Sequence, residues 1–408
     1  MKSKTNGSNL VRRHKRLLIL LGLTFVYLEV MLRLIPWEKK TRELFVMDRT
    51  EEVKATEWYN QWENDHSHLR RTYQAYEIYH LQPFNGIHIN IHPDGYRHTW
   101  NGAPRERQSP IRIGIFGGST IWGSHARDYF TVPSYVSKSL HSRLSNTPVQ
   151  VVNYAEIGFV LSQELHRALR LSYSERALDK PLPRIMVFVD GVNDVLSALT
   201  NFTHGVGKPA GLPWEYEKYE YLFKLGKTGE IGLSDIFKKV KTVRAGINVA
   251  QHVGLAKKDS KNLFIEPTTA DFERLSSEVA KTYIELIKAG SQMLSGLGVA
   301  SVFILQPIMV EKALLSEDER RVFRLNQYWQ GYLKEAYRKI REHAKDLPSN
   351  VTFYDWGALF AEDNETRYND ILHYSESGNE KIGDRLAGLL VNSVPKVAAR
   401  NRFISSTN

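Results

Sequence analysis

The 408-residue sequence contains no cysteine. Disulfide bonds, thiolate chemistry and zinc sites with cysteine ligands are therefore excluded. This absence leaves the compartment open, because bacterial envelope proteins need no disulfides.

Nucleic-acid motifs are also missing. The net charge is +10, but the basic residues are dispersed and neither a zinc-finger nor an RNP-type pattern occurs, so we predict no nucleic-acid partner. A positive charge instead favours an anionic neighbour, such as a phospholipid surface or an acidic glycan. His88 and His92 on one predicted strand face are a weak metal site, and we predict no metal and no organic cofactor.

A long apolar run follows a basic N-terminus. Residues 17–35 are apolar except for Glu29 and Arg33, and about 19 such residues are enough to cross a hydrocarbon core. No small-residue cleavage pattern follows, so we expect an uncleaved transmembrane anchor rather than a cleaved signal peptide. The basic end makes residues 1–16 a predicted cytoplasmic tail, with the catalytic domain extracytoplasmic and periplasmic in a Gram-negative cell.

Residues 36–104 are predicted to form a stalk and N-terminal extension. Two aromatic pairs, Trp58 with Trp62 and Tyr73 with Tyr76, have helical spacing, which favours a stalk helix packed on the main domain over a glycan-stacking platform. The alternation of isoleucines over 87–91, before the turn at 93–95, predicts a half-exposed strand entering a hairpin or edge.

Strands and helices alternate from Ile111 onward. The predicted strands are Ile111–Phe116, Val149–Tyr154, Arg184–Asp190, Ala300–Gln306 and Asn350–Tyr354. The predicted helices are Val132–Leu144, Ser162–Leu171, one after Thr268 and one after Ser316, the last two with capping boxes completed by Asp271 and Glu319. Such alternation predicts an α/β fold with a parallel sheet covered on both faces.

The main domain is predicted to span residues 105–395, with a tail at 396–408. Residues 201–267 interrupt the alternation of strands and helices, so we predict an insertion there. A lid or substrate wall and a packed surface subdomain are both compatible with it.

The stretch 111–123, IRIGIFGGSTIWG, has the pattern of a buried strand that runs into a tight turn. Ser119 would lie at the strand's C-terminal end, where open parallel sheets bind ligands. The stretch is not a P-loop, and Ile121 replaces the second glycine of a Gly-x-Ser-x-Gly elbow. By itself it fits a plain turn, an anion-binding turn or a nucleophile.

Three other polar segments follow predicted strands: Asn153–Gly158, Asp190–Asp194 and Asp370–His373. A parallel sheet brings its strand ends to one edge, so we expect the four segments to converge. In this order they resemble the four blocks of the SGNH hydrolase superfamily, also called GDSL esterases, with Ser119, Gly158, Asn193 and His373 in the corresponding places.

The resemblance covers roughly residues 111–390, and the Gly191–Asp194 and Asp370–His373 blocks match fully. Gly118 departs from the pattern, because it replaces the usual aspartate. The runs GGSTIWGSHARDYFTVPS and FVDGVND resemble a membrane-anchored bacterial branch associated with envelope polysaccharides. The resemblance implies a flavodoxin-like three-layer sandwich with a central parallel sheet of about five strands.

The resemblance also implies the chemistry. Ser119 would be the nucleophile and His373 its base, while Asp370 would orient the imidazole. The backbone N–H groups of Ser119 and Gly158 and the Asn193 amide would form the oxyanion hole. We expect Asp194 to hold its loop, and Asp355 is a weaker rival of Asp370.

These expectations describe a membrane-anchored serine esterase that removes O-acyl groups, with O-acetyl as the first choice, from an envelope or exported polysaccharide. Three alternatives stay open: an O-acyltransferase with the same triad, a lysophospholipase, and a catalytically silent glycan-binding scaffold. The sequence leaves the oligomeric state open.

Overall fold

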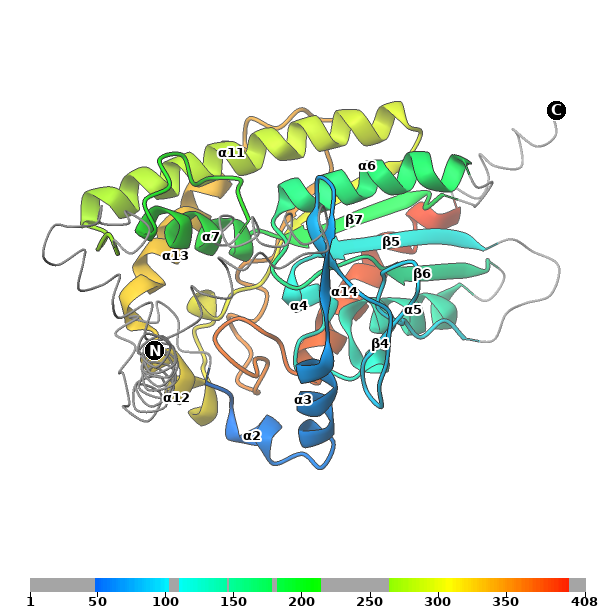
Figure 1. Ribbon diagram of the computed structural model, residues 1–408, viewed down its shortest axis with the longest axis horizontal. Helices are drawn as coiled ribbons and strands as arrows, with labels where there is room; N and C mark the ends of the chain where they lie inside the picture. The colour runs from blue at the N-terminus through cyan, green and yellow to red at the C-terminus, as the bar shows by residue number, and fades with distance from the viewer. Residues whose placement is uncertain (1–47, 103–109, 145–146, 178–181, 214–263, 396–408) are drawn as a thin grey trace, which may run out of the picture. The chain divides into compact units, whose positions relative to one another are not determined.

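The computed structural model describes residues 48–102, 110–144, 147–177, 182–213 and 264–395, which belong to one compact unit of the chain (Figure 1). The predicted cytoplasmic tail, the predicted anchor, most of the predicted insertion and the 396–408 tail lie outside these ranges. Within them, no helix combines the length and the apolar composition that crossing a bilayer requires.

A five-stranded parallel sheet forms the centre of the fold. Its strands are β5 (Ile111–Gly117), β6 (Val149–Asn153), β7 (Ile185–Asp190), β8 (Ala300–Leu305) and β9 (Phe353–Asp355), and their spatial order is β6-β5-β7-β8-β9. This is the flavodoxin-like order, which confirms the predicted fold class. The chain adds β6 on one side of β5 and then crosses to add β7 on the other side. The ligand-binding crevice is therefore expected beyond the C-terminal ends of β5 and β7.

All five predicted strands occur, and the bounds of four of them lie within one residue of the prediction. The fifth begins at Phe353 instead of Asn350, because the preceding residues form a turn in which the Val351 N–H donates to the Pro348 carbonyl.

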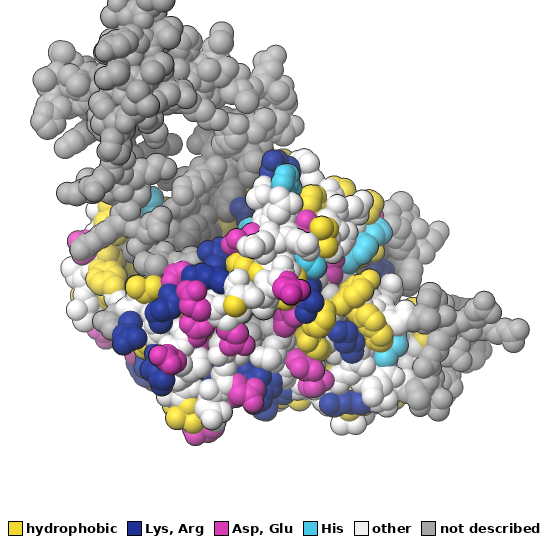
Figure 2. Space-filling model, turned by 90° about the horizontal axis from the view of Figure 1, so that it is seen from below, with side chains coloured by type: hydrophobic (Ala, Val, Ile, Leu, Met, Phe, Trp, Pro, Cys, Tyr) yellow, Lys and Arg dark blue, Asp and Glu magenta, His cyan; other side chains and the backbone are white. Residues whose placement is uncertain are grey.

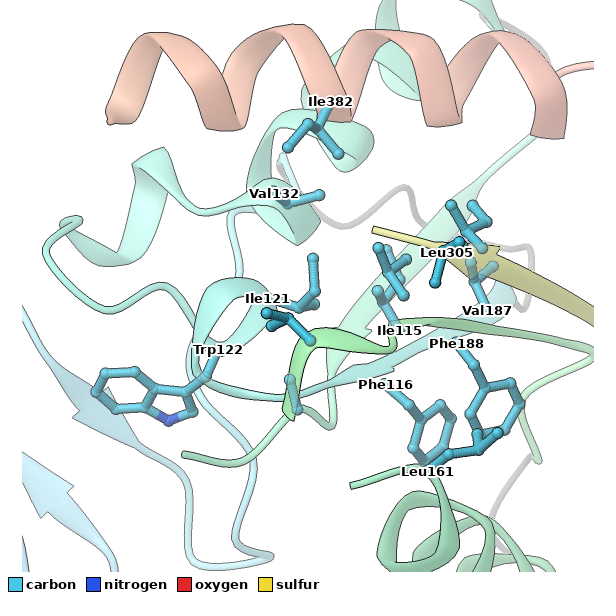
Figure 3. Close-up of a cluster of buried hydrophobic side chains, with 14 of the residues drawn as sticks. Ile115, Phe116, Ile121, Trp122, Val132, Leu161, Val187, Phe188, Leu305 and Ile382 are labelled. Atoms are coloured by element: carbon cyan, nitrogen blue, oxygen red, sulfur yellow. The ribbon is translucent and has the colours of Figure 1, made fainter. Parts of the chain in front are cut away.

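Helices cover both faces of the sheet (Figure 1). On one face, Ile115 and Val187 lie towards Val132 of α5 (Val132–Arg143) and Ile382 of α14 (Glu376–Leu390) (Figure 3). On the other face, Phe116 and Phe188 stack with ring centroids 4.8 Å apart, on the side of α6 (Leu161–Ala177). This face also carries α11 (Thr269–Gly296), which packs on α6, α7 (Val192–Thr203) and α13 (Gln327–Ala344).

Both predicted capping boxes are present. The Thr268 side chain accepts the Asp271 N–H at the start of α11, and the Ser316 side chain accepts the Glu319 N–H at the start of α12 (Glu317–Arg324). The helical region after Ser316 is divided, since α12 ends at Arg324 and α13 begins at Gln327.

The N-terminal extension packs against the main domain. It contains α2 (Glu51–Lys54), α3 (Tyr59–His68), the hairpin of β1 (Arg71–Gln74) with β2 (Ile78–Leu81), and the short pair β3 (Phe84–Asn85) and β4 (Asn90–Ile91). Trp62 is 1% exposed and its indole N–H donates to the Ala126 carbonyl. The packing role predicted for this helix is therefore confirmed.

Two details of the extension differ from prediction. The Tyr73 and Tyr76 spacing was typical of a helix, but Tyr73 lies on β1 and pairs with Tyr79, and Tyr76 occupies the hairpin turn with φ 67°. The predicted strand over 87–91 narrows to Asn90–Ile91. Cross-strand pairing outweighed the local helical spacing in the first case.

Acidic and basic side chains are interspersed on the face shown in Figure 2. In the N-terminal extension, Lys54 lies 3.1 Å from Asp48 and 3.0 Å from Glu51, and Arg321 of α12 also pairs with Asp48. Such exposed pairs contribute about 1 kcal/mol or less each. The described part of this face therefore presents no uniform charge to an anionic partner.

Candidate active site

Ser119 opens a short helix, α4 (Ser119–Trp122), directly after strand β5. The two preceding glycines are required by close packing. A Cβ on Gly117 would lie 2.6 Å from the Val189 carbonyl oxygen, and a Cβ on Gly118 would lie 2.0 Å from the Asn193 amide nitrogen. A side chain at position 118 would therefore have to displace the Asn193 amide from its place.

The structure brings Ser119, His373 and Asp370 into one hydrogen-bonded chain. His373 Nε2 lies 2.8 Å from Ser119 Oγ, and His373 Nδ1 lies 2.7 Å from Asp370 Oδ2. A carboxylate accepts only, so Nδ1 carries the proton and Nε2 accepts the serine hydroxyl. Ser119 is 8% exposed, His373 6% and Asp370 0%. This is the geometry of a nucleophile with its general base and orienting acid.

Asp370 is a charged group in a buried place. Burial by itself raises the pKa of its carboxyl. The electrostatic effect of His373, together with hydrogen bonds from His125 and His373, outweighs burial and holds the pKa well below its usual range. Its other oxygen, Oδ1, accepts the backbone N–H groups of Leu372 and His373, each at 2.8 Å. Asp370 is therefore an ionised partner for the imidazole.

Asp355, the rival acid, does not contact a histidine among the described residues. It lies at the end of β9, where its carboxylate accepts from the Arg341 guanidinium and from the Gly357 N–H at 2.9 Å. The ion pair with Arg341 is about one-third exposed. The geometry therefore favours Asp370 over Asp355 as the orienting acid.

The predicted oxyanion-hole residues gather around Gly118. Asn193 is the second residue of α7, which follows β7, and its amide donates to the Phe159 carbonyl at 2.8 Å. An amide nitrogen carries two protons, so this bond uses one of them. A Cβ on Gly118 would lie 3.3 Å from the same carbonyl. The Gly158 turn and the Asn193 amide thus lie next to the backbone that leads into Ser119.

Several contacts hold the Gly158 turn. Gly158 has φ +85°, a conformation that favours glycine. The preceding Ile157 carbonyl accepts the Tyr79 hydroxyl at 2.8 Å and an Arg71 N–H at 3.2 Å, both from the N-terminal hairpin. Asp194 accepts the Leu161 N–H at 3.3 Å, which agrees with the loop-holding role expected for it.

The sequence reasoning missed His125. This imidazole is buried, and its Nε2 lies 3.1 Å from Asp370 Oδ2, the same oxygen that accepts His373. Its position six residues after Ser119, within the run GGSTIWGSHA, was the available signal. That signal was weak, because nothing local places a residue of this loop against a carboxylate near the C-terminus.

His125, Asp370 and His373 also form a group that could hold a metal ion. Their candidate ligand atoms lie within 4.8 Å of one another, and no other such group occurs in the described ranges. The same atoms already make the hydrogen bonds given above, so a metal would have to displace two protons. Hydrogen bonding accounts for the arrangement without a metal.

No known family profile matches the sequence, and no curated protein matches it. Solved structures with similarity to the chain include the acetyl xylan esterase AlAXEase (14% identity, TM-score 0.35, covering 69% of this chain and 100% of that chain). A lipase/acylhydrolase from Enterococcus faecalis has 14% identity and a TM-score of 0.36, with 69% and 96% covered. A catalytic mutant of the acetylxylan esterase Axe2 from Geobacillus stearothermophilus has 14% identity and a TM-score of 0.34, with 70% and 96% covered. Likenesses of this size do not bear on activity, which has to be argued from the side chains.

Proposed function

We propose that this protein is a serine ester hydrolase of SGNH type. The observation that carries the proposal is the hydrogen-bonded chain Ser119–His373–Asp370, at 2.8 and 2.7 Å, with the Asn193 amide beside the serine's loop. A plain strand-to-helix turn would need none of these groups. Buried histidine and carboxylate side chains of this kind cluster at sites that do chemistry.

The proposed reaction has two halves. Ser119 Oγ attacks the ester carbonyl carbon while its proton passes to His373 Nε2. The resulting oxyanion is stabilised by the N–H groups of Ser119 and Gly158 and by the Asn193 amide. His373 then protonates the departing alcohol, leaving an acyl group on Ser119. Water, deprotonated by His373, attacks this acyl-enzyme; the bond to Ser119 Oγ breaks, the acid leaves, and Oγ takes the proton back from His373.

We propose an O-acyl substrate, with O-acetyl groups of an envelope or exported polysaccharide as the first choice. This choice rests on the predicted anchor at residues 17–35 and on the sequence resemblance to a polysaccharide-associated branch. The same triad supports transfer if a sugar hydroxyl replaces water in the second half. A protease-accessibility experiment on intact cells tests the location, since protection of the chain beyond residue 40 would contradict it.

The first test is the intact mass of the full-length chain in detergent after exposure to an activated acetyl ester. We expect one added acetyl group, or ester turnover where deacylation is fast, and neither with Ser119→Ala. Wild-type protein that gives neither an adduct nor Ser119-dependent turnover would contradict the proposal. Added acetylated and non-acetylated glycans then separate hydrolysis from transfer.

A further inference from the structure

His125 connects the N-terminal extension with the triad. Its Nε2 lies 3.1 Å from Asp370 Oδ2, and its Nδ1 lies 3.0 Å from the Tyr59 hydroxyl of α3. His125 and Tyr59 are 5% and 2% exposed. A residue of α3 therefore reaches the triad's carboxylate through a single imidazole.

The hydrogen-bond partners fix the direction of this chain. His125 Nε2 faces Asp370 Oδ2 at 3.1 Å, and an ionised carboxylate can only accept. Nε2 therefore carries the proton, so the Nδ1 of the neutral ring accepts the Tyr59 hydroxyl at 3.0 Å. A neutral imidazole that accepts at Nδ1 carries its proton on Nε2, where it faces the carboxylate of Asp370.

Asp370 then receives four N–H donors. Oδ1 accepts the backbone N–H groups of Leu372 and His373, while Oδ2 accepts His373 Nδ1 and His125 Nε2. The donors on Oδ2 come from two different loops, so the carboxylate plane is held from both sides. Without His125 it would be held by its own loop alone.

The backbone at His125 is held in an unfavourable conformation. Its φ is +62°, which is uncommon for a residue with a side chain. The surrounding contacts enforce it: the Asn369 amide donates to the His125 carbonyl at 3.1 Å, and Arg97 donates to the Gly123 and Ala126 carbonyls at 2.7 and 2.8 Å. Strain of this kind persists where several contacts over-determine it, and it clusters at functional sites.

We propose that His125 is a positioning residue for Asp370 and that the Tyr59 hydroxyl holds the His125 ring in place by donating to its Nδ1. The N-terminal segment around α3 then completes the active site of the main domain. This inference rests on the proposed ester hydrolysis for its kinetic test, but its structural content can be measured without turnover.

Removal of His125 should move the pH profile of the triad in one direction. His125 takes part of the Asp370 charge, so its removal leaves more of that charge to stabilise the His373 imidazolium. The acidic limb of the kcat/KM profile, which reports the free enzyme's base, should then move to higher pH. Burial lowers the pKa of His125, against the opposing effect of Asp370, so the ring is neutral at pH 7. The titratable and charged groups around it are Asp370, His373, Arg49, Tyr59 and His66.

The kinetic test uses two variants in the full chain. His125→Phe keeps a ring but removes the donor, and we expect kcat to fall about 10- to 100-fold with KM little changed and the acidic limb moved upward. His125→Gln keeps an N–H donor, so it should recover most of the loss. An acidic limb that is unchanged or lower in His125→Phe, or no recovery in His125→Gln, would overturn the proposal.

A matched control and a chelator test accompany these variants. His92→Phe makes the same replacement at a half-exposed histidine of the extension that stacks on Tyr96, and it should leave kcat and the pH profile unchanged. Wild-type turnover should resist a chelator. Chelator-sensitive activity restored by zinc would mean that His125 serves as a metal ligand, and would overturn the positioning role.

The structural test needs no substrate. In the ¹⁵N spectrum of histidine-labelled protein, His125 should be the Nε2–H tautomer, and Tyr59→Phe should shift the Nδ1 resonance through loss of its hydrogen bond while the proton stays on Nε2. An Nδ1–H tautomer in the wild type would overturn the proposal even if ester turnover is strong. The expected tautomer in a protein without turnover would instead contradict the proposed function alone.

Discussion

Two buried clusters of ionisable groups lie near the C-terminal ends of the central strands, and they differ in how their carboxyls are satisfied. In the triad cluster, Asp370 accepts four N–H groups and its pKa lies well below the usual range. In the second cluster, Asp190 of β7 meets Glu164 of α6 and lies near Asp194 of α7. Neither Glu164 oxygen has a donor among the described residues.

The carboxyls of the second cluster have raised pKa values. Burial raises the pKa of Asp190 to about 7, with hydrogen bonds from Tyr283 and Glu164 opposing the rise. Burial and the nearby Asp190 and Asp194 raise the pKa of Glu164 well above its usual range. Both carboxyls therefore hold their protons to higher pH than an exposed carboxyl does. The comparison shows that depth alone does not decide whether a buried carboxyl is charged, since Asp370 has four N–H donors whereas Glu164 has other carboxyls beside it.

The largest effect that tests the comparison is the loss of charge at Asp370. Asp370→Asn places an amide opposite the imidazole, favours the wrong tautomer of His373, and should lower kcat for an acetyl ester by about 10³- to 10⁴-fold. Asp355→Asn is the matched control and should change kcat by less than about threefold. Equal losses in the two variants would show that the triad has been assigned to the wrong acid.

The next effect concerns Gly118, which lies between the triad and Asn193. Gly118→Ala places a methyl group where the Asn193 amide lies, 2.0 Å away. Displacement of that amide should lower kcat by about 10²-fold. Gly331→Ala on α13, where an added Cβ has no neighbour within 4 Å, should leave kcat unchanged. Full activity in Gly118→Ala would exclude Asn193 from the oxyanion hole.

The second cluster should affect stability rather than rate. Folded Asp190 keeps its proton to higher pH than unfolded Asp190, so the folded state binds more protons between about pH 4 and pH 7, and its stability falls as pH rises through that window. Asp190→Asn removes this dependence and keeps the oxygen that accepts the Tyr283 hydroxyl. We expect a gain on the order of 1 to 4 kcal/mol in the free energy of unfolding at pH 8.

Asp370 changes stability with pH in the opposite direction. Its pKa is lowered by folding, so its contribution to stability is present above the unfolded value of 3.8 and is lost as pH falls through the lower folded value.

Urea titrations at pH 5 and pH 8 measure how Asp190→Asn changes the free energy of unfolding. A wild-type protein whose stability rises across this range, with no effect of the substitution, would contradict the raised pKa of Asp190.

The smallest expected effect comes from a variant at a position remote from both clusters. Thr268→Ala removes the cap of α11 and should cost about 1 kcal/mol of unfolding free energy. The ester kcat should not change. A loss of activity here would mean that stability alone can explain losses elsewhere, so this variant calibrates the others.

Local signals predicted most of the fold. The β-branched strands, the two capping boxes and the glycines after β5 depend on residues that are neighbours in sequence, and each was found where it was expected. The errors arose where long-range pairing decided the outcome. Tyr73 has helical spacing with Tyr76 but pairs with Tyr79 across a hairpin, and no local pattern could have shown that.

The sequence by itself determined the four polar blocks and their order along a parallel sheet, because strand alternation and turn residues act over short distances. Only the tertiary structure decided that Asp370 rather than Asp355 meets His373, and that His125 and Tyr59 extend the chain into the N-terminal segment. These contacts join segments far apart in sequence, and they depend on which buried donors and acceptors the folded core brings within hydrogen-bond reach.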